Sequence, residues 1–348
     1  PFVSHAFLSA LEHSGSVGPG TGWSPAPLLI RDADGVPAAA LPAYLKSHSQ
    51  GEYVFDHHWA DAFHRAGGQY YPKLQIAAPF SPVPGPRLLV RDPAMALPIL
   101  RAAEAVVEQN GLSSAHATFV DETELAQFRS AGWLTRVGAQ FHWKNRDYAD
   151  FEEFLGALSS RKRKAIRKER TGAQSAARIE QISGADITSE HWDAFWIFYQ
   201  DTGARKWGTP YLTRAFFDII GDTMRDSIVL FLAFAGDRPI AGALNFVGPD
   251  CLYGRYWGCI SEVPFLHFEL CYYQAIDYAI AHGLARVEAG AQGEHKLARG
   301  YEAVPTYSAH YIANEGFRMA VADFLERETH AMEREIEFLG DMAPFKKG

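Results

Sequence analysis

Cysteine is scarce in this chain of 348 residues: Cys251, Cys259 and Cys271 are the three present, and none lies in a CxxC spacing. The sequence therefore lacks a disulfide framework and the usual pattern of a zinc site, which fits a reducing cytoplasm.

Long apolar runs are also missing. The longest strongly apolar run, Ile228–Ala235, is far shorter than the roughly 20 residues that a membrane span needs. The first residues lack the basic start of a signal peptide. We therefore expect a cytoplasmic protein, either free in the cytoplasm or at the inner face of the membrane.

Basic residues are in deficit, with 33 Lys and Arg against 41 Asp and Glu and a net charge of −8. A chain of this charge is a poor general binder of nucleic acids or anionic lipids, although a local basic patch can still bind them. Apolar residues make up 47% of the chain, enough to bury a substantial core. At roughly 150 residues per domain, the length predicts about two domains.

Three sequence patterns occur twice, in the same order, in the two halves of the chain. They are a strand–turn–strand pattern, a helix that stops at a glycine before a strand, and a Gly-aromatic pair followed nine residues after the aromatic by histidine. The matched segments are 28–41 with 230–244, 99–119 with 268–289, and 132–142 with 300–310. Their common order indicates a duplication, although α/β units in general also share a helix–glycine–strand order.

The second half predicts a mixed sheet with helices on both faces, because strands alternate with helices after an antiparallel hairpin. Strands are expected over 178–182, 230–235, 238–244, 251–258, 286–289 and 305–312, and helices over 190–201, 212–224, 266–281, 294–299 and 317–339. The predicted domains are 1–148 with a long loop at 43–95, and 175–315. A basic helical connector is expected over 149–174, and a C-terminal helix and tail over 316–348.

This element order resembles the GNAT acyltransferase superfamily, and the duplication with a basic segment between the halves resembles Fem-type aminoacyltransferases. The resemblance is strongest to the bacterial FemAB-like group of peptidoglycan biosynthesis/recognition proteins. The stretches that carry it are YYPKL (70–74), GPRLL (85–89), RKRKAIRK (161–168), LYGRYWG (252–258), LHFE (266–269) and GAQGEHK (290–296). It implies an α/β fold of tandem GNAT-like domains.

The resemblance implies an N-acyltransferase that moves an acyl or aminoacyl group from an activated donor to an amine of a cell-envelope precursor. The implied donors are aminoacyl-tRNA and acyl-CoA or an acyl carrier protein. The Gln/Arg-x-x-Gly-x-Gly/Ala turn that binds the pyrophosphate of CoA is absent at 258–265, which speaks against acetyl-CoA. Long-chain acyl transfer to an amino lipid and a non-catalytic cell-wall recognition module are the alternatives. We expect neither a metal nor a tightly bound cofactor.

A glycine-rich turn with clustered charges follows the strand expected at 286–289. Side chains of this type can exchange protons near neutral pH and hold anionic groups of a donor, so we expect the catalytic and donor sites here. Expected catalytic residues are Glu288, Glu294 and His295, and expected donor-binding residues are Gly290, Gly293, Lys296 and Arg299. The resemblance adds Arg255 to the donor-binding residues, because it lies on the strand that flanks the acyl group in GNAT folds. The alternatives are a sheet-edge carboxylate, a charged helix start and core packing.

Aromatic side chains with carboxylates suit an ammonium-bearing acceptor, through cation–π contacts and ion pairs. The expected acceptor-binding residues are Asp56, Tyr71, Lys73, His267 and Glu269. Packing of a long insertion, or a capped helix start, would explain the same residues.

The connector carries a dense basic run, Arg161, Lys162, Arg163, Lys164, Arg167 and Lys168. Such a run is typical of contact with RNA or an anionic membrane, or of a solvated helix face.

Overall fold

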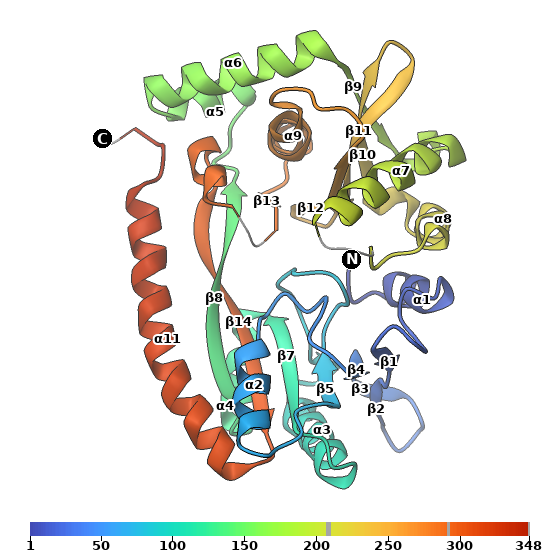
Figure 1. Cartoon of the computed structure of the whole chain (residues 1–348), viewed down its shortest axis with the longest axis vertical. Helices are drawn as coiled ribbons and strands as arrows, with labels where there is room; N and C mark the ends of the chain where they lie inside the picture. Colours follow the sequence, from blue (N-terminus) through green and yellow to red (C-terminus); the bar gives the residue numbers. More distant parts are fainter. Residues whose placement is uncertain (207–209, 291–292, 347–348) are drawn as a thin grey trace. The chain divides into compact units, whose positions relative to one another are not determined.

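The computed structural model describes residues 1–206, 210–290 and 293–346 (Figure 1). The chain folds into two compact units, and neither is a continuous segment. Unit 1 consists of Pro1 and residues 140–304 and 337–348, and unit 2 of residues 2–139 and 305–336.

Unit 1 contains a mixed sheet in the order β8–β13–β12–β11–β10–β9, in which β12 and β13 are parallel and the other pairs antiparallel. Its strands are β8 (Leu134–Lys144, which begins in unit 2), β9 (Arg178–Ser183), β10 (Ile228–Ala235), β11 (Arg238–Val247), β12 (Cys251–Cys259) and β13 (Arg286–Glu288). Its helices are α5 (Phe151–Ala157), α6 (Ser160–Ala176), α7 (Ser189–Lys206), α8 (Arg214–Thr223), α9 (Leu266–Phe268), the π-helix η5 (Glu269–Tyr273), α10 (Gln274–Ala281) and the short η3 (Gly184–Asp186), η4 (Arg225–Ser227) and η6 (Glu294–Arg299).

Successive side chains along β10 and β11 point to opposite faces of this sheet, and helices cover both faces. Val229, Phe231 and Ala233 belong to a core that includes residues of α6, η5 and α10. On the opposite face, a Cβ at Gly242 would lie 2.8 Å from Leu232 and 3.1 Å from Phe195 of α7. A strand that is buried on both faces must be apolar throughout, as Ile228–Ala235 is.

Unit 2 contains a sheet in the order β1–β4–β5–β7–β14, with β5 and β7 parallel, and a small sheet β2–β3–β6. Its strands are β1 (Trp23–Pro25), β2 (Leu28–Arg31), β3 (Pro37–Leu41), β4 (Ala43–Lys46), β5 (Lys73–Ile76), β6 (Leu89–Val90), β7 (Ser114–Val120) and β14 (Glu302–Ile312, which begins in unit 1). Its helices are α1 (His5–His13), α2 (His57–Arg65), α3 (Ala96–Gln109), α4 (Leu125–Ser130), most of α11 (Glu315–Asp341) and the short η1 (Pro93–Met95) and η2 (Glu122–Glu124). No helix in the described part of the chain is long and apolar enough to cross a membrane.

The expected mixed α/β class is confirmed, and so are the basic helix α6, the C-terminal helix α11 and the strands and helices expected in the second half. The expectation of a long loop at 43–95 is wrong. This range contains β4, α2, β5 and β6, and two of these strands lie in the main sheet of unit 2. The strands are short, with four residues each in β4 and β5, which explains why alternation over so few residues did not reveal them.

The pairing of 28–41 with 230–244 is also wrong in detail. The hairpin β2–β3 lies in the small sheet, whereas the strand that pairs with β5 of the parallel pair is β4, and β1 pairs with β4. A strand–turn–strand pattern is local, and it does not specify the sheet that the hairpin joins.

The other two sequence matches have the same local geometry in both halves. Gly111 and Gly283 end their helices with φ of 61° and 64°, and Gly132 and Gly300 have φ of 82° and 85°. The residue after each glycine donates its N–H to a carbonyl five residues back, as a helix C-cap does.

The strands that follow Gly132 and Gly300 cross the division between the units. β8 begins in unit 2 and ends in unit 1, and β14 begins in unit 1 and ends in unit 2. The compact units therefore differ from continuous halves, and the ranges 1–148 and 175–315 stay a prediction.

Candidate active site

The parallel strands β12 and β13 pair over only three residues before they part. The paired positions end at Tyr253 and Glu288, where β13 stops, while β12 continues to Cys259. Just beyond this point β12 has a bulge against β11, with Arg255 as the extra residue. A Cβ at Gly254 would lie 3.5 Å from the carbonyl oxygen of Glu288, which is an ordinary contact distance. The local sequence thus opens the sheet beside a carboxylate.

Glu288 is buried at this opening, with 4% of its surface exposed. Its Oε1 accepts a hydrogen bond of 3.2 Å from Arg286 Nε, and its Oε2 has no hydrogen-bond partner among the described residues. Burial raises the pKa of Glu288 to about 7, and the positive charge of Arg286 opposes this rise. The group can therefore exchange a proton near neutral pH.

His142 of β8 lies opposite Glu288 in the antiparallel register. Its Nε2 is 4.0 Å from Glu288 Oε2 and 3.1 Å from Gln140 Oε1. Burial, together with the charges of Arg286 and Lys296, lowers the pKa of His142 to about 3. The imidazole is therefore neutral at neutral pH, and the contact with Glu288 is polar without being an ion pair.

Lys296 lies in the glycine-rich turn, as the sequence predicts, but its ammonium binds the chain itself. Nζ donates a hydrogen bond of 2.9 Å to the carbonyl of Gly290, and the residue is 2% exposed. Burial lowers the pKa of Lys296 to about 8. Gly290 and Gly293 have φ of 80° and 109°, which only glycine adopts readily. A donor contact of these three residues stays a prediction.

Arg299 joins η6 to helix α6. Its guanidinium donates two hydrogen bonds of 2.9 Å to Glu169 and stacks on Phe268 at 3.5 Å. His295 is exposed, and its Nε2 lies 2.9 Å from the hydroxyl of Tyr272. The side chain of Glu294 and residues 291–292 lie outside the described part of the structure. The expected roles of Glu294, His295 and Arg299 in catalysis and donor binding stay predictions.

Glu269 opens the π-helix and is completely buried. Its Oε1 accepts hydrogen bonds from Arg170 at 3.2 Å, Gln174 at 2.9 Å and Gln274 at 2.8 Å. This network joins α6 to the π-helix, a structural role that the sequence did not predict. His267 is half-buried, with its ring 5.2 Å from that of Trp257. Acceptor binding by His267 and Glu269 stays a prediction.

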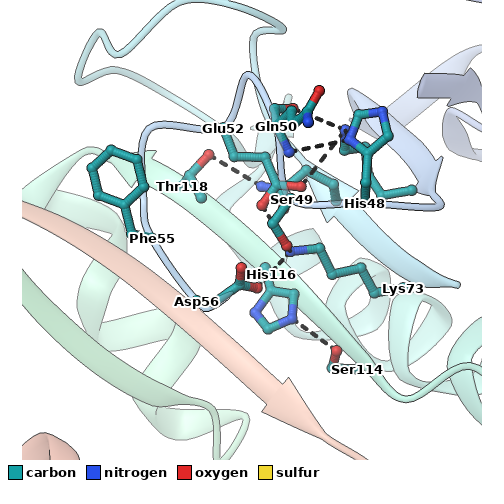
Figure 2. A network of polar contacts seen from close by, with 12 residues as sticks. His48, Ser49, Gln50, Glu52, Phe55, Asp56, Lys73, Ser114, His116 and Thr118 are labelled. Atoms are coloured by element: carbon teal, nitrogen blue, oxygen red, sulfur yellow. Dashed lines mark hydrogen bonds and ion pairs between the residues drawn. The ribbon is translucent and has the colours of Figure 1, made fainter. Parts of the chain in front are cut away.

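In unit 2, Asp56 and Lys73 form a buried ion pair (Figure 2). Lys73 Nζ lies 2.5 Å from Asp56 Oδ2 and 2.7 Å from Glu52 Oε2, and the hydroxyl of Tyr70 donates to Asp56 at 2.7 Å. The two carboxylates raise the pKa of Lys73 against the effect of its burial. Tyr71, only half-buried, contacts Ser49 Oγ at 2.8 Å. The predicted acceptor role of Asp56, Lys73 and Tyr71 is untested, and their observed contacts stabilise unit 2.

The two units place polar pairs at corresponding strand positions. Glu288 and His116 each lie five residues after a capping glycine, and His142 and His310 each lie ten residues after one. Glu288 is opposite His142 in unit 1, and His116 is opposite His310 in unit 2, where the two Nδ1 atoms are 2.7 Å apart. Sequence analysis identified the histidines as part of a repeat but missed His142 as a site residue, because its partner is set by strand register.

Among the described residues, no group of three or more His, Cys, Asp or Glu side chains could hold a metal ion. Where β12 and β13 stop pairing, Glu288 can instead exchange a proton near neutral pH.

The chain belongs to the FemAB-like family, described as peptidoglycan biosynthesis/recognition, which it matches over residues 1–347. The expected family and the tandem GNAT-like fold class are thus confirmed. No protein of curated function matches the chain significantly.

Solved structures share the fold at low sequence identity. L-PGS from Bacillus licheniformis has a TM-score of 0.55 at 10% identity, over 94% of this chain and 97% of that chain. The C-terminal domain of a protein from Agrobacterium fabrum, proposed as a lysylphosphatidylglycerol synthetase, has a TM-score of 0.55 at 12% identity, over 86% and 88%. FemX has a TM-score of 0.53 at 13% identity, over 91% and 93%.

Proposed function

We propose that the protein is an N-acyltransferase whose reaction takes place where β12 and β13 part, with Glu288 as the general base. The observation that carries this proposal is the buried carboxylate at the opening, with a pKa of about 7 and an oxygen that makes no hydrogen bond within the described residues. A general base works best when its pKa is near the working pH.

The reaction has a simple balance of atoms and protons. The nitrogen of a neutral amine attacks the acyl carbon of an ester or thioester, and the C–O or C–S bond to the leaving group breaks. The nitrogen gives up one proton, which Glu288 accepts directly or through one water, and the leaving oxygen or sulfur takes up a proton. His142 is neutral, so it does not oppose the approach of an ammonium group that must lose its proton before attack.

The family description and the name of one similar fold support the proposed substrates. The FemAB-like family is described by peptidoglycan biosynthesis/recognition, and one similar fold comes from a protein described as a putative lysylphosphatidylglycerol synthetase. We therefore propose an amine of a cell-envelope precursor as the acceptor, with an amino lipid as the alternative. An aminoacyl-tRNA, an acyl-CoA or an acyl carrier protein supplies the acyl group.

A transfer assay tests this proposal. Purified protein is incubated with labelled acyl-CoA of short and long chain, or with labelled aminoacyl-tRNA, together with bacterial lipid and peptidoglycan-precursor extracts. Label that enters an amide product identifies donor and acceptor. Glu288→Gln should lower kcat by roughly 10²–10⁴ and remove an ascending limb of the pH profile near pH 7. Glu190→Gln, which alters an exposed carboxylate on α7, should not change turnover.

Two outcomes would contradict the proposal. If folded Glu288→Gln protein retains full turnover, Glu288 is not the base. If the unaltered protein binds the precursor extract but forms no amide from any donor, the second candidate, a recognition module without catalysis, is correct. The family description, which includes recognition, is what favours this second candidate.

A further inference from the structure

Helix α6 presents a row of basic side chains to solvent. Arg161, Lys164 and Lys168 are separated by three and four residues, a spacing that places them on one side of the helix. All three are exposed, and within the described residues none of them forms an ion pair. We call these three residues the basic stripe. The buried residues Ile166 and Ala173 lie on the opposite side of the helix.

The only acidic side chain of α6 does not compensate this charge. Glu169 accepts hydrogen bonds from Arg299 at 2.9 Å and from the hydroxyl of Tyr273. Both partners, Arg299 and Tyr273, are buried in unit 1, so the carboxylate of Glu169 points away from the basic stripe. The protein as a whole carries a net charge of −8, so a row of three unpaired positive charges distinguishes this face from the rest of the chain.

Exposed apolar side chains lie at both ends of the same helix. Near its C-terminal end is Phe265, which is 38% exposed and lies beside Gly172, where a Cβ would be 3.4 Å from its ring. At the N-terminal end, Ser159 donates its N–H to the carbonyl of Pro344 at 2.9 Å. Pro344 follows Met342 by two residues and Phe338 by six, and these two side chains are 47% and 63% exposed. Ile197 is the only other large apolar residue of the described part of unit 1 with comparable exposure.

From this combination we infer that the α6 face docks on the surface of an anionic lipid bilayer. Basic side chains are attracted to lipid phosphates, and apolar side chains beside them can enter the region below the headgroups. RNA would also attract the stripe, but it offers no apolar layer for Phe338 and Met342. Glu337 and Asp341 lie next to these two residues and weaken their contribution, so Phe265 and the basic stripe supply most of the binding. Lipid docking does not depend on the acyl transfer proposed above.

Vesicle cosedimentation tests the docking. The probes are vesicles of phosphatidylcholine alone and of phosphatidylcholine with about one-third phosphatidylglycerol. Each basic residue near an anionic surface contributes about 1 kcal/mol, so the triple variant R161Q/K164Q/K168Q should lose partitioning by up to about 100-fold. Phe265→Asn, a residue tolerated at its φ of 67°, should lose roughly 5-fold.

A matched control keeps the loss of charge but changes its place. The triple variant R129Q/R225Q/R238Q removes three exposed basic side chains outside α6 and should bind the anionic vesicles as the unaltered protein does. Equal losses in both triple variants, or equal binding to neutral and anionic vesicles, would overturn the docking face. Failure to bind vesicles would also overturn it. If the unaltered protein retards mixed transfer RNA in a gel and only the α6 variant does not, the stripe binds RNA instead.

Discussion

The ionisation of Glu288 should make the folded protein less stable as the pH rises, and substitution by glutamine should remove this effect. The folded-state pKa is about 7 and the usual value is 4.5. Between these values the folded state binds more protons than the unfolded state, so the free energy of unfolding falls with increasing pH. The stabilisation of the protonated form is complete below about pH 4.5 and is lost as the pH passes through 7.

The magnitude follows from the two pKa values. Each pKa unit corresponds to about 1.4 kcal/mol, so the full effect is about 3 kcal/mol, of which about 2 to 3 kcal/mol falls between pH 5 and pH 8. Glutamine is similar in size and stays neutral. The difference in the free energy of unfolding between the unaltered protein and Glu288→Gln should therefore change by that amount over this range, in favour of the variant at pH 8.

Urea unfolding at pH 5 and pH 8, followed by circular dichroism, measures the difference. Other titrating groups, including His142, are present in both proteins and largely cancel. Glu190→Gln, at an exposed position, should run parallel to the unaltered protein at both pH values. If the Glu288→Gln protein also runs parallel, the carboxylate is solvated, and both the raised pKa and the proposed base are wrong.

Two further predictions concern the stability of the fold. Lys73→Met leaves Asp56 and Glu52 buried beside an apolar group and should cost about 3–5 kcal/mol by chemical denaturation; a loss below about 1 kcal/mol would contradict the ion pair. Gly258→Ala would place a Cβ 2.0 Å from the carbonyl oxygen of Phe198 and should cost about 1–3 kcal/mol, whereas Gly156→Ala in α5, with no atom within 4 Å, should raise the melting temperature. Equal effects at the two glycines would refute the packing argument.

Much of the fold could be predicted because the relevant patterns are local. The apolar run of β10, the glycine stops at Gly111 and Gly283 and the periodic helix at 266–281 each depend on residues close together in the sequence. The same holds for the basic composition of α6. The family resemblance, carried by short stretches along the whole chain, was confirmed for the same reason.

The candidate site could be predicted only in part. Glu288 was identified because a carboxylate within a short apolar strand followed by a glycine-rich turn is unusual. Its pairing with His142 depends on strand register, and the burial that raises its pKa depends on the packing of strands and helices around it. Neither of these is encoded in residue spacing.

By itself, the sequence determined the elements, their order and the residue types available for chemistry, because these depend on short-range periodicity and on backbone preferences at glycine. The tertiary structure alone decided that β8 ends in unit 1 and β14 in unit 2, and that Lys73 and Asp56 pair with each other. Strands that pass from one unit into the other, like buried ion pairs, bring together residues that are far apart in the sequence. Their free energies depend on which groups are removed from water together, and that is decided only when the chain has packed.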